Sequence, residues 1–238
     1  MQAVIMAAGK GSRLREGTKD KPKPMAEVCG KPMVDWILDE FDAVGIDRVV
    51  MVVGYKKEQL QAHLKSRDIV YVSNPFFEFG QVLSSFWFAL NEINMEQDLL
   101  FCHADTIFES KILERVLATE GDIVLPYDTR DCGEEEMKVR LDSSGNIIEL
   151  SKTMDLSHSQ GEFIGLALIR RSKLRDLVRV SRSIIDEGGL DAYFEAALQR
   201  MKEKEIAKLT GLNVTGLQWN EIDFPEDLDA ANSFNWKF

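Results

Sequence analysis

The sequence predicts an α/β protein with a doubly wound, Rossmann-like mixed sheet and a small antiparallel β elaboration. Two observations carry this prediction. Up to residue 127, short apolar runs typical of buried parallel strands alternate with segments of helical periodicity. Beyond residue 136, apolar and polar residues alternate around a polar turn, which is typical of an antiparallel hairpin.

The first half of the chain supplies most of the predicted parallel sheet. Residues 3–7 form an apolar run that is stopped by Gly9, as in a buried strand. Residues 32–44 place apolar side chains three or four positions apart, with Pro32 at the start and Gly45 after the end, which predicts a helix. The other elements predicted in this half are strands at 48–55, 69–72, 99–108 and 122–127 and helices at 56–65, 83–93 and 111–118.

The second half adds the antiparallel part. Residues 137–152 predict a hairpin whose turn is the sequence SSGN. The elements predicted after it are a strand at 163–169, helices at 172–186 and 190–202, a strand region at 206–214 and a helix after Pro225. Because no linker rich in Pro, Ser or Gly divides the chain, we expect residues 1–238 to form a single domain.

Overall charge and cysteine content exclude several classes of protein. The chain has 238 residues, with 29 Lys and Arg against 40 Asp and Glu, and a formal net charge of −11. Nucleic-acid and anionic-membrane binding both need clustered positive charge, so neither partner is expected. The three cysteines are widely spaced and form no metal-ligand pattern, which is typical of a protein in a reducing compartment. The sequence also has no basic leader followed by an apolar run, and no apolar run of about 18 residues that could span a membrane. We therefore expect a cytoplasmic protein.

Positive charge is concentrated in residues 9–31, where seven cations stand against three acids. A charge run is most often a solvated surface. In this run, however, Gly9 and Gly11 allow the backbone to approach a phosphate, and Arg13 can neutralise its charge. The spacing is neither that of a P-loop nor that of a dinucleotide fingerprint, whose third glycine is replaced by Leu14. The segment therefore predicts a phosphate site of another kind.

The run AAGKGSRL at 7–14, followed by KPKPM at 21–25, resembles the signature of the nucleotidyltransferases that activate sugar 1-phosphates and related phosphate monoesters. The resemblance runs through the whole chain and implies a sheet of nucleotidyltransferase type. It also implies that Arg13 wraps the triphosphate and that Lys23 contacts the phosphates during transfer. The nucleotide-binding residues that it implies are Ala8, Gly9, Gly11, Ser12, Gly80, Gln81 and Ser85.

Two acids match the positions at which this family holds its metal ion. They are Asp105 in CHADTIF and Asp223 in WNEIDFPEDL. Mg²⁺ takes hard oxygen ligands and commonly uses only one or two carboxylates, so we expect Mg²⁺ as the cofactor. The structural alternatives are a helix N-cap for Asp105 and a turn before Pro225 for Asp223.

The middle of the chain points to a branch of the family. Residues 131–152, followed by GEFIGLALI at 161–169, look more like the cytidylyltransferases that use phosphocholine or 2-aminoethylphosphonate than like the inositol-phosphate or hexose-phosphate branches. By that resemblance Lys152 reaches the phosphates of the reacting pair. A substrate ammonium is commonly held by carboxylates and aromatic faces. The substrate-binding residues that we predict are Glu136, Asp191, Tyr193 and Trp219.

Together these residues predict a Mg²⁺-dependent cytidylyltransferase that couples CTP to a small phosphate or phosphonate and releases pyrophosphate. The acceptor oxygen would attack the α-phosphorus in line, and none of His63, His103 and His158 is expected to be catalytic. One alternative is a nucleotidyltransferase that uses UTP, dTTP or CTP with a sugar 1-phosphate or an inositol phosphate. Another is a catalytically silent nucleotide-binding module. The sequence also leaves open whether the protein forms a homodimer.

Overall fold

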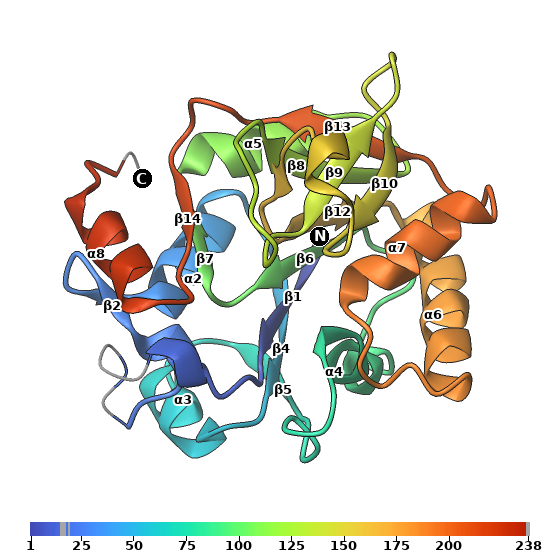
Figure 1. Cartoon of the computed structure of the whole chain (residues 1–238). Coiled ribbons are helices and arrows are strands. Elements are labelled where there is room, and N and C mark those ends of the chain that lie inside the picture. The colour runs from blue at the N-terminus through green and yellow to red at the C-terminus, as the bar shows by residue number, and fades with distance from the viewer. Residues whose placement is uncertain (15–17, 19, 237–238) are drawn as a thin grey trace.

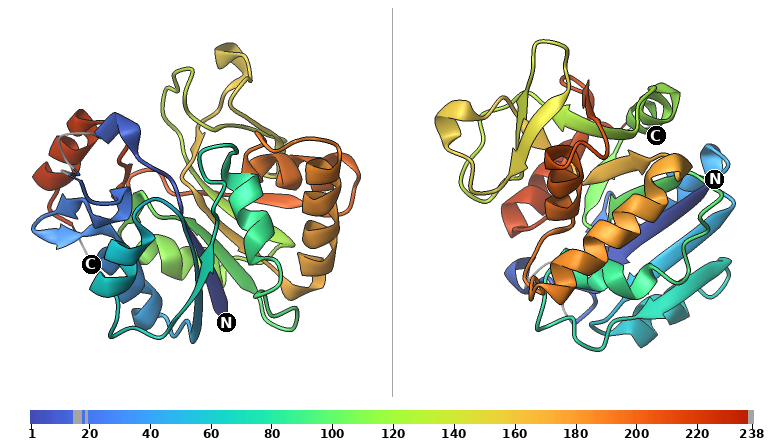
Figure 2. Two further views of the ribbon diagram at one scale, coloured as in Figure 1. Left: turned by 90° about the horizontal axis from the view of Figure 1, so that it is seen from below. Right: turned by 90° about the vertical axis from the view of Figure 1, so that its right-hand side faces the viewer.

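The computed structural model describes residues 1–14, 18 and 20–236. Its centre is a ten-stranded mixed sheet with helices on both faces (Figures 1 and 2). This confirms the doubly wound α/β fold with an antiparallel elaboration. None of the helices in the described part of the chain is long and apolar enough to cross a membrane.

The parallel half of the sheet is built from the first strands of the chain. β1 (Gln2–Ala7) is fully buried and runs parallel to β4 (Arg48–Val53) on one side and to β6 (Leu99–His103) on the other. β5 (Ile69–Ser73) extends the parallel part beyond β4. Because these strands run in one direction, the segments that follow them meet at one edge of the sheet, where ligands bind in open α/β sheets.

The antiparallel half begins at β12 (Leu166–Ile169), which pairs with β6 and with β8 (Ile123–Asp128). β11 (Glu162–Phe163) then pairs antiparallel with β8. Beyond it, the predicted hairpin is confirmed as β9 (Lys138–Leu141) paired with β10 (Ile147–Ser151), and β13 (Leu209–Asn213) runs parallel to β8. The two halves therefore share one continuous sheet.

Helices cover both faces because side chains of the central strands alternate between two cores. Along β1, Val4 and Met6 lie in one buried cluster, and Ala3 and Ile5 lie in the other. The first cluster packs under α4 (Val82–Ala89), α6 (Arg171–Asp186) and α7 (Phe194–Glu203). The second packs under α2 (Met33–Ala43), α3 (Lys57–His63) and α5 (Ser110–Ala118). Figure 2 shows α6 lying across one face of the sheet.

Two predicted strands are each divided in the structure. The strand predicted at 99–108 is β6 followed by β7 (Thr106–Phe108), which leaves the main sheet and pairs antiparallel with β14 (Trp219–Glu221). The strand predicted at 163–169 breaks at Gly165, whose φ of +79° is a left-handed conformation that glycine adopts without strain. Both breaks fall beside the cavities described below.

A third, smaller core lies beside the sheet. α8 (Pro225–Ser233) and the short strands β2 (Glu27–Val28) and β3 (Lys31–Pro32) surround it. Its buried residues include Leu14, Ile107 and Ile222, which come from three distant parts of the sequence. This cluster holds the loop after β1 against the segment after β14 (Figure 1).

Candidate active site

The loop after β1 turns through Gly11 into a 3₁₀ segment at Ser12–Leu14. Gly11 has a φ of +60°, and a Cβ atom added there would lie 2.6 Å from Cβ of Lys23. Glycine is therefore required for both the backbone conformation and the close approach of the KPKPM segment. Two cations of the basic run, Arg15 and Lys19, lie outside the described residues.

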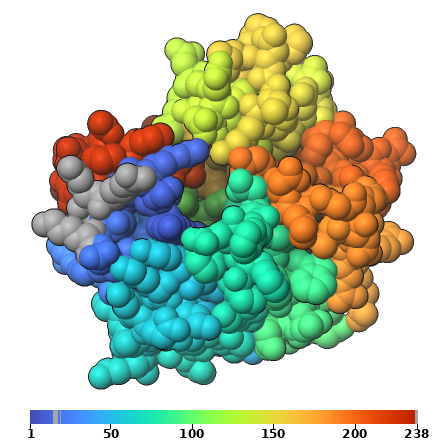
Figure 3. All heavy atoms as spheres, turned by 60° about the horizontal axis from the view of Figure 1, so that its bottom comes forward, coloured from blue at the N-terminus to red at the C-terminus, as the bar shows by residue number. Residues whose placement is uncertain are grey.

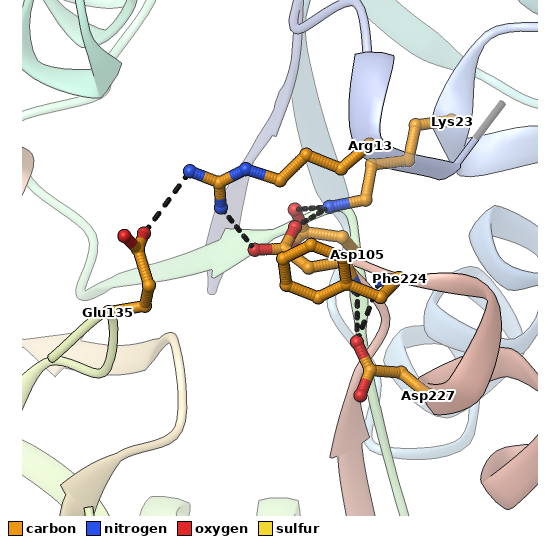
Figure 4. Close-up of polar contacts among 7 residues, drawn as sticks. Arg13, Lys23, Asp105, Glu135, Phe224 and Asp227 are labelled. Carbon is orange, nitrogen blue, oxygen red and sulfur yellow. Dashed lines mark hydrogen bonds and ion pairs between the residues drawn. The ribbon is translucent and has the colours of Figure 1, made fainter. Parts of the chain in front are cut away.

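Lys23 is the centre of the site. It is 8% exposed, and its Nζ lies 2.7 Å from Oδ2 of Asp105 and also pairs with Oδ1 of Asp223 (Figure 4). Arg13 approaches the same site, 3.2 Å from Oδ2 of Asp223 and 3.1 Å from Oε2 of Glu135. Two cations predicted to bind phosphates and two acids predicted to bind a metal thus converge.

The pairing of β7 with β14 brings the two acids together. Glu221 lies opposite Thr106 in this pairing, and the amide of Ile222 donates to the carbonyl of Asp105 at 2.9 Å. The amide of Asp223 donates to the Asp227 carboxylate at 3.0 Å, which fixes the turn into α8. Asp105 caps no helix in the described structure, because α5 begins five residues later with Glu109 as its N-cap residue.

The charges at this point depend on one another. Burial alone would lower the pKa of Lys23, but the carboxylates of Asp105 and Asp223 outweigh it, so the pKa is raised and the ammonium persists. Burial would raise the pKa of Asp105, yet Lys23 and His103 hold it below its usual value. For Glu221, burial and the nearby Asp105 carboxylate raise the pKa to about 7. The site therefore holds more carboxylates than Lys23 alone can neutralise.

A divalent cation fits this cluster. Asp105, Glu221 and Asp223 each offer an oxygen, and these oxygens lie within 4.8 Å of one another. Oδ1 of Asp105 is buried and has no hydrogen-bond partner in the described structure. Mg²⁺ binds hard oxygen ligands such as carboxylates, and a bound Mg²⁺ would satisfy the buried oxygen of Asp105.

Two cavities meet at this cluster. The first, about 190 Å³, contains the predicted nucleotide-binding residues Ala8, Gly9, Gly80, Gln81 and Ser85 in its wall. The second, about 400 Å³, contains Gly11, Ser12 and Arg13 and extends toward the antiparallel half. Figure 3 shows a hollow bordered by the blue N-terminal loop, the teal segment around α4, the orange α7 region and the yellow-green hairpin region. The residues that line both cavities are Gly9, Lys23, Gln81, Val82, His103 and Asp105.

Charged side chains from the antiparallel half line the second cavity. Lys152 is among them, with its Nζ 4.7 Å from the ring centre of Tyr193. Glu136 also lines it and has a buried Oε2 without a hydrogen-bond partner in the described residues. Burial raises the pKa of Glu162 to about 7, although its ion pair with Arg130 opposes the shift.

Two predicted substrate-binding residues lie elsewhere. Trp219 is 4% exposed, its Nε1 donates to Oδ2 of Asp128 at 3.0 Å, and the Arg130 guanidinium covers its ring at 4.3 Å. Its place in β14 turns the indole into the core, outside the described lining of both cavities. Asp191 is exposed and precedes α7, also outside that lining.

The prediction also missed Glu221 and His103, which the structure brings into the site. Glu221 stands two positions before Asp223, a spacing that places side chains on one face of a strand, and this signal was available in the sequence. His103 and Glu195 meet with Nε2 and Oε1 3.4 Å apart. They are 92 positions apart, so no local pattern connects them.

Known proteins of similar sequence include CTP:phosphoglutamine cytidylyltransferase from Campylobacter jejuni, which is 26% identical over 97% of this chain and 98% of that protein. CMP-5'-(3-aminopropyl)phosphonate synthase from Streptomyces rubellomurinus is 27% identical over 98% of this chain, which spans 38% of that protein. The chain spans about half the length of several other relatives that it matches.

The fold has close counterparts among solved structures. CTP:phosphocholine cytidylyltransferase from Streptococcus pneumoniae superposes with a TM-score of 0.80 over 97% of each chain, at 18% identity. The MobA-like NTP transferase domain matches residues 3–189, which include the glycine loop, Lys23 and Asp105. The chain therefore belongs to the family of MobA-like NTP transferase domains and is a nucleotidyltransferase.

Proposed function

We propose that this protein is a Mg²⁺-dependent cytidylyltransferase that couples CTP to a small phosphate or phosphonate carrying an amino or ammonium group. The observation that carries the proposal is the Lys23 ammonium, held between Asp105 and Asp223 where two cavities meet. One cavity would take the nucleotide and the other the acceptor. We further propose that residues 1–238 act as one catalytic domain.

The reaction would be a direct transfer. An acceptor oxygen attacks the α-phosphorus of CTP, the bond from that phosphorus to the bridging oxygen breaks, and pyrophosphate leaves with the electron pair. A phosphate or phosphonate oxygen is already largely ionised near pH 7, so a general base is unnecessary. Since both reactants are anions, catalysis would consist of positioning and charge neutralisation by Arg13, Lys23 and Lys152.

Asp105, Glu221 and Asp223 would hold Mg²⁺. When bound, Mg²⁺ would neutralise negative charge on the phosphate oxygens. Lys23 would then be released from its two carboxylate partners and could pair with a phosphate oxygen instead. Its ion pairs with Asp105 and Asp223 keep Lys23 beside the position at which it would act.

The second cavity supports an acceptor with a cationic end. Its wall combines the acids Glu136 and Glu162 with the aromatic ring of Tyr193. Cations are held by such surroundings through charge and through the ring face. The two relatives at 26% and 27% identity have names that specify CTP or CMP and an amino-bearing phosphorus compound, phosphoglutamine or aminopropylphosphonate. These names support the same acceptor class for this chain.

A pyrophosphate-release assay over a matrix of nucleotides and acceptors tests the proposal. The nucleotides are CTP, UTP and dTTP, and the acceptors are 2-aminoethylphosphonate, phosphocholine, phosphoglutamine, inositol 1-phosphate and glucose 1-phosphate. We expect release only with CTP and an acceptor that carries an amino or ammonium group. Release with UTP or dTTP and glucose 1-phosphate would establish the sugar-phosphate alternative. CTP binding by calorimetry without release on any acceptor would establish a silent nucleotide-binding module.

The metal assignment has its own test. Asp105→Asn keeps the size of the side chain but removes the charge, so we expect activity to fall by about a hundredfold or more and to need much higher Mg²⁺. Asp155→Asn is the matched control, because Asp155 caps an exposed 3₁₀ segment away from the site. An Asp105→Asn enzyme with a lower melting temperature but normal Mg²⁺ dependence would contradict the assignment.

A further inference from the structure

His103 and Glu195 form a pair for which the proposed reaction has so far had no use. We infer that His103 donates a hydrogen bond to a phosphate or phosphonate oxygen of the acceptor and that Glu195 is the positioning residue that holds the imidazole. The inference rests on the proposed function, because it requires an acceptor of this class in the second cavity.

The meeting point of the cavities identifies the residues that can face the reaction. The α-phosphorus belongs to the nucleotide and is attacked by the acceptor, so it must be reached from both cavities. The polar side chains that line both are those of Lys23, Gln81, His103 and Asp105. Lys23 and Asp105 pair with each other. Gln81 and His103 are therefore the polar groups at the junction outside this ion pair, and His103 is the one that a buried carboxylate, that of Glu195, stands beside.

The immediate neighbours of His103 belong to the acceptor side. Gly165 and Glu195 line the second cavity. The amide of His103 donates to the carbonyl of Gly165 at 3.0 Å. A Cβ atom added at Gly165 would lie 3.3 Å from Cδ2 of His103, so the glycine leaves room for the ring. The imidazole thus stands against the wall that the acceptor would contact.

Packing between α7 and β6 brings Glu195 to His103. The ring of Phe194, the first residue of α7, stacks on Phe101 of β6 with centroids 3.7 Å apart and planes 4° apart. Phe101 stands two residues before His103 in the same strand, so the stacked rings set the distance between Glu195 and the imidazole. Glu195 is 3% exposed and is therefore held in place by its surroundings.

The pair is polar, buried and incomplete. Oε1 of Glu195 lies 3.4 Å from Nε2 of His103, which is longer than an ordinary charge-assisted hydrogen bond. Within the described residues, Nε2 of His103 and Oε2 of Glu195 are both buried and make no hydrogen bond. Buried polar atoms are normally satisfied, and Nε2 faces Glu195, so the contact between these two side chains is the one that would satisfy it. Nδ1 is then the nitrogen that would donate to an acceptor oxygen, since an imidazolium can donate from both of its nitrogens.

Four variants test this pair: His103→Phe removes the donor, His103→Gln keeps one, Glu195→Gln weakens the positioning contact, and His158→Phe is the control at an exposed site. The measurements are the acceptor KM in pyrophosphate release with 2-aminoethylphosphonate or phosphocholine, the CTP dissociation constant by calorimetry, and the melting temperature.

We expect His103→Phe to raise the acceptor KM about tenfold or more, as for a lost hydrogen bond to a charged group, and to change the CTP dissociation constant by less than about twofold. We expect His103→Gln to stay within about threefold, Glu195→Gln to fall between, and His158→Phe to match the wild type.

The outcomes separate this inference from the proposed function. A wild-type enzyme that is inactive with these acceptors overturns the proposed function and this inference together. An active wild type with an unchanged acceptor KM in His103→Phe overturns the inference alone, as does an equal loss of CTP affinity, which would indicate general damage. If His103→Phe does not fold, Glu195→Gln decides, because an unchanged acceptor KM in that variant overturns the inference.

Discussion

The two cavities are built in different ways, although they share one wall. The wall of the first includes Ala8, Gly9 and Gly80, and these small residues leave the backbone of two short stretches of the chain exposed to the cavity. The wall of the second includes Lys152, Glu162 and other charged side chains that come from the antiparallel half. Recognition by backbone depends on loop conformation, whereas recognition by side chains depends on residue identity. Under the proposed function, the nucleotide side, which is the first cavity, would be fixed by local geometry, and the acceptor side, which is the second cavity, could change its specificity by substitution.

Lys23→Ala removes the ammonium group at the point where the two cavities meet, and we expect it to have the largest effect. The ammonium is buried between two carboxylates and would neutralise the phosphates, so we expect turnover to fall by about a thousandfold or more. The variant should also bind Mg²⁺ more tightly, because Asp105 and Asp223 lose their internal cation. Pyrophosphate release and calorimetry measure the two effects.

Lys21→Ala is the matched control for that variant. Lys21 belongs to the same basic segment, but it pairs with Glu27 at 3.2 Å on the surface. We expect its turnover to stay near that of the wild type. Near-normal turnover in Lys23→Ala with an intact circular dichroism spectrum would remove Lys23 from the reaction.

Glu162→Gln tests the charge of the acceptor side through protein stability. Burial raises the pKa of Glu162 from 4.5 to about 7 in the folded protein. A raised pKa means that the folded state holds its proton more firmly, so this contribution to stability is complete below pH 4.5 and is lost as the pH rises through about 7. The variant should gain about 3 kcal/mol of unfolding free energy relative to the wild type between pH 4.5 and pH 8.

Urea denaturation at both pH values measures this difference. Glu149→Gln is the control, because Glu149 forms a comparable pair with Arg140, at 2.8 Å, in a more exposed position. We expect its stability to follow that of the wild type at both pH values. If the unfolding free energies of wild type and Glu162→Gln change with pH in parallel, the folded protein does not raise the pKa of Glu162.

The same contrast explains how much of the molecule the sequence predicts. The first cavity draws mainly on two short stretches, the end of β1 with the glycine loop and residues 77–85 before and in α4, so period and turn residues predict them, and the KPKPM segment predicts a phosphate site. The acceptor side depends on pairings such as β7 with β14 and on the stacking of Phe194 on Phe101, which no local pattern encodes. For this reason the sequence predicts Trp219 in the site and no role for His103, although the indole is buried and the imidazole lines both cavities.

Gly11→Ala sharpens the comparison at the glycine loop, which runs from the first cavity into the second and where backbone conformation should matter most. An alanine at a φ of +60° is strained, and its Cβ would lie 2.6 Å from Cβ of Lys23, so the loop must shift. We expect the CTP dissociation constant to rise about tenfold. Gly45→Ala carries a similar strain at φ +72° with no atom near its Cβ, and Gly45 lies outside the described lining of both cavities, so the variant should lower stability without changing CTP affinity. Equal CTP affinity in both variants would contradict a nucleotide site fixed by this loop.

Glu135→Gln has the smallest expected effect and tests whether an ion pair of the second cavity affects CTP binding. Arg13 of the glycine loop pairs with Glu135 of the acceptor side at 3.1 Å, and both side chains are about half exposed or more (Figure 4). Under the proposed function, CTP would take Arg13 from this partner, and an exposed ion pair contributes only about 0.2–1 kcal/mol. The variant should therefore bind CTP about two- to threefold more tightly at low salt, and the gain should disappear at high salt because exposed charges are then screened.

Glu134→Gln removes a neighbouring exposed charge and should leave CTP affinity unchanged if the pairing with Arg13 is the cause. A gain of equal size in both variants would mean that the acidic loop acts through its total charge, and the two cavities would then be linked by the electrostatic field rather than by one contact.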